Sequence, residues 1–195
     1  MNLRTFALST SVLAVALVLA GCTIQPSGMG MDHTSTPSSD AAAFNIADET
    51  FATNMIAHHE QAIVMADLLL DKDGVDQRVI SLAQEIKDAQ GPEIETMKGW
   101  LDAWGVVTDD SGMDGMDHSG AMMSDEDMSA LEAASGADAS RLFLEQMTQH
   151  HRGAIDMAQQ ELDNGENPDA LDLAQTIIDA QTAEIATMQG ILATL

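Results

Sequence analysis

The chain has 195 residues, a length that suits one folded domain with tails. Its formal net charge of −25 at pH 7 argues against nucleic acid and anionic lipid headgroups as partners, because both need clustered Lys and Arg. The single cysteine excludes an intramolecular disulfide, and the 14 methionines supply thioethers, which bind soft metals without forming disulfides.

Residues 1–21 are typical of an export signal. Arg4 supplies a positive start, an apolar run follows from Phe6 to Ala20, and Leu19-Ala-Gly21 precedes Cys22. The run is too short for an ordinary membrane-spanning helix. The segment resembles the lipobox of bacterial lipoproteins, in which the cysteine is acylated. We therefore expect a lipid on Cys22 that holds the protein on a membrane, at the cell surface or in the periplasm; a free thiol in an uncleaved anchor is the alternative.

Residues 22–44 are rich in Ser, Thr, Pro and Gly and predict a flexible tether between the lipid and the domain. The folded domain is expected to begin near Asn45 and to extend to residue 195. The tether contains the sequence Gly28-Met-Gly-Met-Asp-His33, which holds two methionines and a histidine close together.

An internal repeat dominates the rest of the chain. MIAHHEQAIVMA at residues 55–66 and MTQHHRGAIDMA at residues 147–158 share their pattern at an offset of 92 residues. A second pair of segments, which begins at Ala83 and Ala174, matches at an offset of 91. The one-residue slip falls in a turn, so each half is expected to be a helix, a short turn and a helix.

Boundary residues support this division. Asp71 to Gly74 and Asn164 to Asn167 are turn clusters, and Asn167-Pro-Asp169 is a typical helix start. Pro92 is expected to kink a helix that remains continuous. The sequence thus predicts an all-α, ferritin-like four-helix bundle made of two repeated helix hairpins, at about residues 45–105 and 138–195.

Residues 106–137 form the expected linker between the two halves. Its first part is rich in Met, Gly and Asp, and Ser124 to Ala134 is expected to form a short helix. Short spacings of Met and His can wrap a metal ion without a preformed pocket, although a low-complexity spacer is the alternative. The candidate secondary metal ligands in tether and linker are Met29, Met31, His33, Met113, Met116, His118, Met122 and Met123.

The repeated motif places its histidines on the inward face of a helix. At about 100° per residue, the apolar stripe of the first helix is about 120° wide. It comprises Phe51, Met55, His58, His59, Ala62, Met65, Ala66 and Leu69, while Glu60 and Asp67 fall outside it. The second helix of each half carries a glutamine and a glutamate on its apolar face, at Gln90 and Glu93 and at Gln181 and Glu184.

Buried imidazoles and carboxylates need partners, because an unpaired one costs several kcal/mol. Hydrogen bonds among these histidines, glutamates and glutamines are one interpretation. The other is a metal site, because a methionine also lies three or four residues before each histidine pair and six or seven residues after it. Methionine, histidine and carboxylate around one axis indicate a soft or borderline metal.

Copper fits this set best. Di-iron bundles need Glu-x-x-His motifs, and none occurs in the chain. Zinc gains little from methionine, whereas imidazole binds both oxidation states of copper and thioether favours Cu(I). Silver would share the thioether sites, and other soft or borderline metals remain open.

The doubled motif, followed in each half by Gln-x-x-Glu-Ile-x-x-Met, resembles domain-of-unknown-function family 305 (DUF305) over about residues 45–195. That resemblance implies a ferritin-like, exported fold, and the family includes CopM-like copper-binding proteins linked to copper resistance. By position it implies metal contacts at Met55, His58, His59, Met65, Glu93, Met97, Met147, His150, His151, Met157, Glu184 and Met188.

The sequence therefore predicts an extracytoplasmic, lipid-anchored protein that sequesters or passes on copper, as Cu(I) and also as Cu(II) or Ag(I), or that serves copper resistance. Its partners are the metal ion and the membrane, not nucleic acid; no protein partner is indicated. One alternative is a metal-dependent oxidoreductase of the cell envelope, although no substrate-pocket signature supports an enzyme. The other is a structural or partner-binding bundle whose histidines sense pH.

Overall fold

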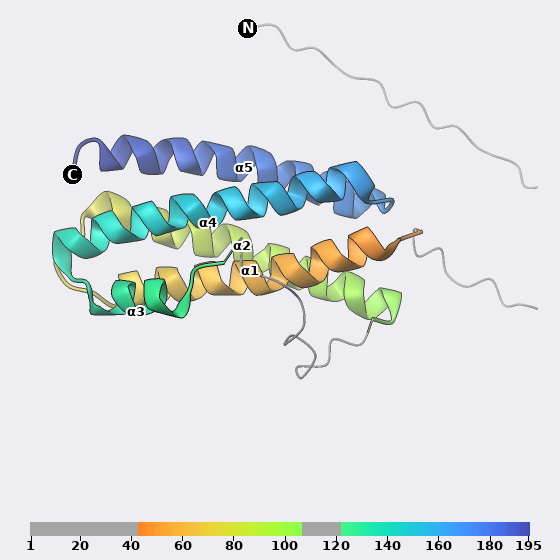
Figure 1. Ribbon diagram of the computed structural model, residues 1–195, viewed down its shortest axis with the longest axis horizontal. Helices are drawn as coiled ribbons and strands as arrows, with labels where there is room; N and C mark the ends of the chain where they lie inside the picture. The colour runs from red at the N-terminus through yellow and green to blue at the C-terminus, as the bar shows by residue number, and fades with distance from the viewer. Residues whose placement is uncertain (1–42, 107–121) are drawn as a thin grey trace, which may run out of the picture. The chain divides into compact units, whose positions relative to one another are not determined.

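The structure is a computed structural model that describes residues 43–106 and 122–195. Within those ranges the chain forms five α-helices and no strand, so the all-α prediction is confirmed (Figure 1). The helices are α1 (Ile46–Leu70), α2 (Gln77–Trp104), α3 (Asp125–Ala133), α4 (Gly136–Asn164) and α5 (Pro168–Leu192). None of these helices is both long enough and apolar enough to cross a membrane. The expected signal peptide and nearly all of the tether lie outside the described residues.

Local sequence sets where the helices begin. Asn45 caps α1 and forms a capping box with Asp48, and Ser124 does the same for α3 with Asp127. Asn167 caps α5, and Pro168 follows at the first helical position, as predicted. Pro92 lies inside α2, which runs on without a break. The second repeat begins slightly earlier than expected, because α4 starts at Gly136 rather than at residue 138.

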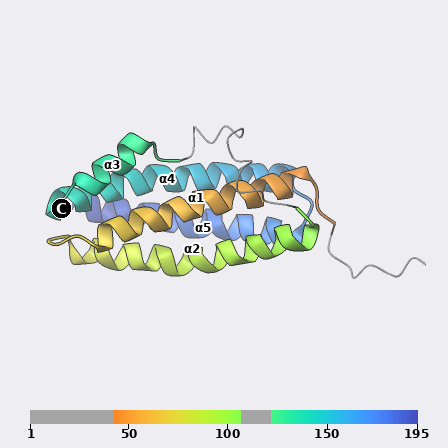
Figure 2. The same ribbon diagram turned by 90° about the horizontal axis from the view of Figure 1, so that it is seen from below.

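The long helices pack in pairs. Helix α1 lies along α2, α4 lies along α5, and the two pairs meet through α1 and α4. Helix α3 packs on α1 and α4 near one end of both, as the two views show (Figures 1 and 2). The stripe predicted on α1 is buried along its whole length, whereas Glu60 and Asp67 are exposed.

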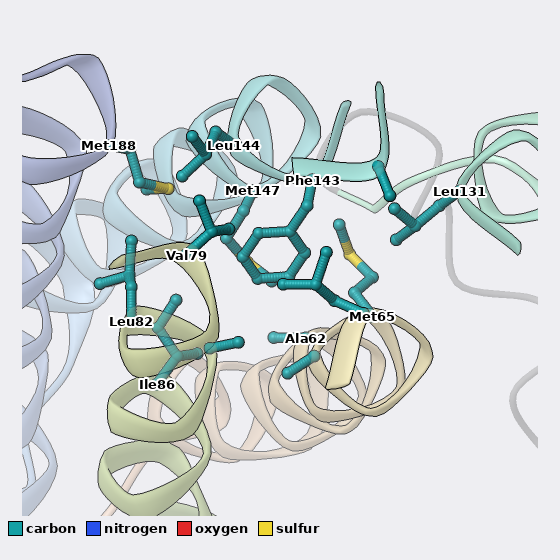
Figure 3. Close-up of a cluster of buried hydrophobic side chains, with 14 of the residues drawn as sticks. Ala62, Met65, Val79, Leu82, Ile86, Leu131, Phe143, Leu144, Met147 and Met188 are labelled. Carbon is teal, nitrogen blue, oxygen red and sulfur yellow. The ribbon is translucent and has the colours of Figure 1, made fainter. Parts of the chain in front are cut away.

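Two apolar clusters lie at different levels along these helices. One contains Phe143 of α4, whose ring points toward Met65 of α1 and Val79 of α2 (Figure 3). The other contains Phe51 of α1 and residues of α2, α4 and α5. On both α1 and α4 the histidine pair comes between the residues of the two clusters, so apolar side chains close the layer of histidines on both sides.

Each turn between paired helices is held by a polar side chain from the other pair. The Asp48 carboxylate on α1 accepts hydrogen bonds from the backbone N–H groups of Glu166 and Asn167, which lie in the α4–α5 turn. The Ser140 hydroxyl on α4 accepts a 3.0 Å bond from the N–H of Asp76, the N-cap of α2. Asp48 and Ser140 are 92 residues apart, so the same repeat position makes both contacts.

The Ser140 contact is tested by a pair of serine variants. Ser140→Ala should lower the free energy of unfolding by about 1–2 kcal/mol, because the N–H of Asp76 loses its partner. Ser135→Ala is the matched control, since Ser135 starts the same helix without a side-chain capping bond. Urea denaturation of both variants measures the difference, and equal midpoints would show that the cross-contact contributes nothing.

Candidate metal centre

The four histidines of the doubled motif lie together inside the protein. His59, His150 and His151 have 0% of their surface exposed and His58 has 1%. Each pair lies near the middle of a long helix, on the buried face of α1 or α4. The prediction that all four imidazoles face the interior is therefore confirmed.

The first histidine of each pair meets its counterpart across the α1–α4 contact. The ring centroids of His58 and His150 are 3.6 Å apart, and the ring planes differ by 30°. His58 and His59 are further from each other, with ring centroids 6.5 Å apart. The contact between the two halves of the chain thus includes a pair of tilted, closely approaching imidazoles.

The second histidine of each pair hydrogen-bonds to the glutamate predicted on the apolar face of the following helix. His59 Nε2 lies 2.8 Å from Glu93 Oε2, and His151 Nε2 lies 2.6 Å from Glu184 Oε2. The glutamate side chains are 19% and 22% exposed, while those of the histidines are fully buried. Each His–Glu hydrogen bond therefore connects the buried layer of histidines to the protein surface.

Several polar atoms in this layer lack partners. Among the described residues, Nδ1 of His59 and Nδ1 of His151 have no hydrogen-bond partner, and neither does either amide atom of Gln90 or Oε1 of Gln181. Buried polar atoms are seldom left unpaired in folded proteins. Unpaired imidazole nitrogens are also suitable donors for copper, so the chemistry of the layer fits a metal ion.

The environment of His150 disfavours its charged form. Burial is the main cause that holds the pKa of His150 well below its usual value, and repulsion from His58, His151 and His59 adds to it. A backbone hydrogen bond at His58 opposes this only in part. His150 is consequently a neutral imidazole near pH 7, the form that binds metals.

The predicted methionine ligands lie in the apolar clusters on either side. Met65, Met147 and Met188 belong to the cluster around Phe143, where Figure 3 shows all three. Met55 and Met97 belong to the other cluster, against which the partly buried Met157 packs. The sulfur of Met188 accepts a 3.7 Å hydrogen bond from the Thr148 hydroxyl. These methionines fill the core as well as flank the histidines.

The described residues do not contain a complete set of nitrogen and oxygen ligands for one metal ion. No three His, Cys, Asp or Glu side chains within residues 43–106 and 122–195 form a group that could hold one metal ion. Two of the four imidazoles already bond to glutamates. Binding through this layer therefore requires either sulfur ligands or the opening of a His–Glu hydrogen bond.

The remaining predicted site residues divide between two regions. Met123 is buried and its backbone exchanges two hydrogen bonds with the side chain of Gln61, while Met122 is partly buried. The other residues lie outside the described part of the chain: Cys22, Met29, Met31, His33, Met113, Met116 and His118.

Sequence reasoning missed a second polar group, the carboxyl pair of Asp48 and Glu161. Both residues are buried, with 0% and 1% of their surface exposed. One sign of this pair is present in the repeat. At an offset of 92 residues, the acid Glu161 corresponds to an apolar residue, Leu69, so the two halves differ there.

Comparisons with known proteins place this architecture. A family model described as a domain of unknown function (DUF305) matches residues 48–192. The structure is similar to a DUF305 protein of Streptomyces coelicolor, provisionally described as secreted, with a TM-score of 0.68 and 33% identity over 76% of this chain and 91% of that one. It is also similar to a DUF305 fragment of Deinococcus radiodurans, with a TM-score of 0.71 and 29% identity over 79% of this chain and 100% of that one.

Similarity extends to CopM, a protein solved with metals bound. The Cu(II)-bound form of CopM gives a TM-score of 0.65 and 33% identity over 75% of this chain and 96% of that one. Cu(I)-bound and silver-bound forms of CopM match as well, at 32% and 30% identity. No curated protein sequence matches the chain.

The pKa of His150 predicts an acid-sensitive fold. Because the folded pKa lies below the unfolded one, the free energy of unfolding should fall as pH drops below about 6.5, with a contribution near 1.4 kcal/mol per pH unit. His150→Gln should remove this contribution, whereas Gln149→Ala, an exposed neighbour on α4, should not. Urea unfolding in a metal chelator at pH 7, 6 and 5 measures both, and an unchanged pH slope in His150→Gln would contradict the assignment.

Proposed function

The chain belongs to the DUF305 family, and from that premise we propose that it is an extracytoplasmic, lipid-anchored protein that binds copper and sequesters it. The copper is cargo and not a catalyst. Cu(I) is the preferred form, with Cu(II) and Ag(I) also bound, and the outcome for the cell is copper resistance.

The observation that carries the proposal is the layer of four buried histidines between two methionine-containing clusters, in a fold similar to CopM. CopM is known in Cu(I)-bound, Cu(II)-bound and silver-bound forms. The unpaired imidazole nitrogens in this chain are donors suited to the same metals.

Residue roles follow from donor chemistry. His58, His59, His150 and His151 would hold the metal, and the thioethers of the adjacent methionines would favour Cu(I). Glu93 and Glu184 would orient His59 and His151 through the hydrogen bonds described above. The methionines and histidines of the tether and linker would bind further copper and deliver it to this layer.

The proposal includes the architecture that carries the layer. The packing of α1 on α2 and of α4 on α5 supports a ferritin-like four-helix bundle of two repeated hairpins. In the full layout, residues 1–21 would be a lipoprotein signal, 22–44 a tether and 45–195 the bundle domain. The provisional description of the Streptomyces coelicolor relative as secreted agrees with export.

A second candidate function is a metal-free bundle whose histidines respond to pH. The two His–Glu hydrogen bonds favour it, because they satisfy part of the layer without a metal. The low pKa of His150 would then make acid the signal that loosens the α1–α4 contact. Copper binding discriminates between the two candidates.

Copper titration tests the metal site directly. Purified protein titrated with Cu(I) against a competing chelator should bind tightly, and replacing His58, His59, His150 and His151 with alanine should weaken the tightest binding by at least a hundredfold. The matched control replaces Met29, Met31, Met113 and Met116 with leucine. This control should lose weaker equivalents and keep the tightest one.

Three results would contradict the copper proposal. They are an absence of tight binding, equal affinity in the four-histidine variant, and loss of the tightest equivalent in the leucine control. A circular dichroism spectrum and a urea midpoint for each variant separate a lost ligand from a lost fold.

Lipid attachment is tested at Cys22. Cells grown with radiolabelled palmitate should label the wild-type protein, and Cys22→Ser should abolish the label because the acylated sulfur is missing. Fractionation should then find the variant outside the membrane fraction. Labelling of Cys22→Ser equal to that of the wild type would refute the anchor.

A further inference from the structure

Asp48 and Glu161 form a buried pair of acids away from the histidine layer. Asp48 is saturated, because its carboxylate accepts hydrogen bonds from the backbone N–H groups of Asn45, Glu166 and Asn167. Burial acts to raise the pKa of Asp48, but these bonds and the one to Glu161 outweigh it and lower the pKa. Asp48 is therefore the ionised member of the pair.

Glu161 has no such set of donors. Apart from Asp48, neither of its carboxyl oxygens meets a hydrogen-bond partner in the described part of the chain. Burial, followed by the interaction with Asp48, raises the pKa of Glu161 to about 8. Two adjacent carboxyl groups cannot both be ionised at low cost, so at neutral pH they share one proton.

Packing alone does not account for an acid at this position. The equivalent residue of the first repeat is Leu69, which is fully buried in the apolar cluster around Phe143. Gly165 also leaves room for the acid, because a Cβ atom there would collide with Oε1 of Glu161. A leucine would fill the space without the cost of burying a carboxyl group.

Glu161 also lines a groove between α1 and α4. The groove has a volume of about 200 Å³, and it is lined by apolar side chains, namely Ile46, Ala47, Phe51 and Met157, together with oxygen-bearing ones from both helices, namely Thr50, Asn54, Gln160, Glu161 and Asn164. Asn54 Oδ1 is a second buried oxygen without a partner among the described residues. At the repeat-equivalent position, Gln146 donates its amide to the carbonyl of Asp127 in α3, which packs on α1 and α4 there.

We propose that this groove is a cation site, in which a hard divalent ion such as Ca²⁺, Mg²⁺ or Mn²⁺ replaces the proton shared by Glu161 and Asp48. The ion is held by the carboxylate of Glu161, by Asn54 Oδ1 and by water. Binding releases one proton from the pair, so the charge of the site rises by one unit. The ligands of this ion are oxygen atoms and not the four histidines proposed to hold copper; Met157, a candidate copper ligand, also lines the groove.

Donor chemistry and charge both select this class of ion. Carboxylate and amide oxygens are the ligands of hard cations, whereas the histidine layer offers nitrogen and sulfur. Glu161 lies ten residues from His151 on α4, about 15 Å along the helix axis. The net charge of −25 concentrates cations near the protein, and no Lys or Arg in the described part of the chain forms an ion pair with either acid.

The test uses Mn²⁺ as the probe and the loss of its free-ion electron paramagnetic resonance signal as the readout. The full chain should bind one Mn²⁺ at pH 8.5 and at least tenfold more weakly at pH 6.5, because protons compete for Glu161. Ca²⁺ should displace the bound Mn²⁺. One equivalent of Ag(I), a probe of the histidine and methionine ligands, should leave Mn²⁺ binding unchanged.

Glu161→Gln should reduce Mn²⁺ affinity at pH 8.5 by at least tenfold. The variant should fold, because glutamine matches the protonated acid in shape and charge. Glu49→Gln, a partly buried acid next to Asp48 that does not line the groove, is the matched control and should bind as the wild type does. The proposal is overturned by equal affinities of Glu161→Gln and wild type, by equal losses in both variants, by affinity independent of pH, or by competition from Ag(I).

Discussion

Burial of four imidazoles between two apolar clusters is the constraint on which the rest of the structure depends. Because apolar side chains lie on both sides of this layer, few hydrogen-bond partners are available to the imidazole nitrogens. The rings of His58 and His150 lie against each other at a tilt where α1 meets α4, and His59 and His151 reach outward to carboxylates on α2 and α5. This layer therefore defines the contact between the two helix pairs and also holds the atoms best suited to bind copper.

Much of this arrangement can be predicted from the sequence, because the same pattern occurs in both halves of the chain and each half supports the interpretation of the other. Helical periodicity placed the stripe of α1 inward and Glu60 and Asp67 outward, and turn and capping residues marked the start of α5. Periodicity could not assign different partners to adjacent histidines, because both lie near the centre of one stripe. Nor could it separate methionines that fill the core from methionines that bind metal, since both uses need the same inward position.

The two halves differ where the repeat is broken, and the sequence does not show what those differences do. Helix α3 packs on α1 and α4 at one end of their contact, whereas the groove lies between the same two helices at the other end. A hidden leucine in the first repeat becomes an acid in the second. Comparison of the two repeats shows the exchange of Leu69 for Glu161, but the burial of the acid beside Asp48 and the groove next to it come only from the structure.

The exchange of turn contacts between the helix pairs bears on how such a chain could arise. Asp48 of the first pair holds the turn of the second, and Ser140 of the second pair holds the turn of the first. The adjacent rings of His58 and His150 likewise come one from each pair. A single helix–turn–helix unit could satisfy these contacts only by associating with a second copy of itself. Gene duplication of such a homodimer would join the two copies in one polypeptide, after which each half could change separately.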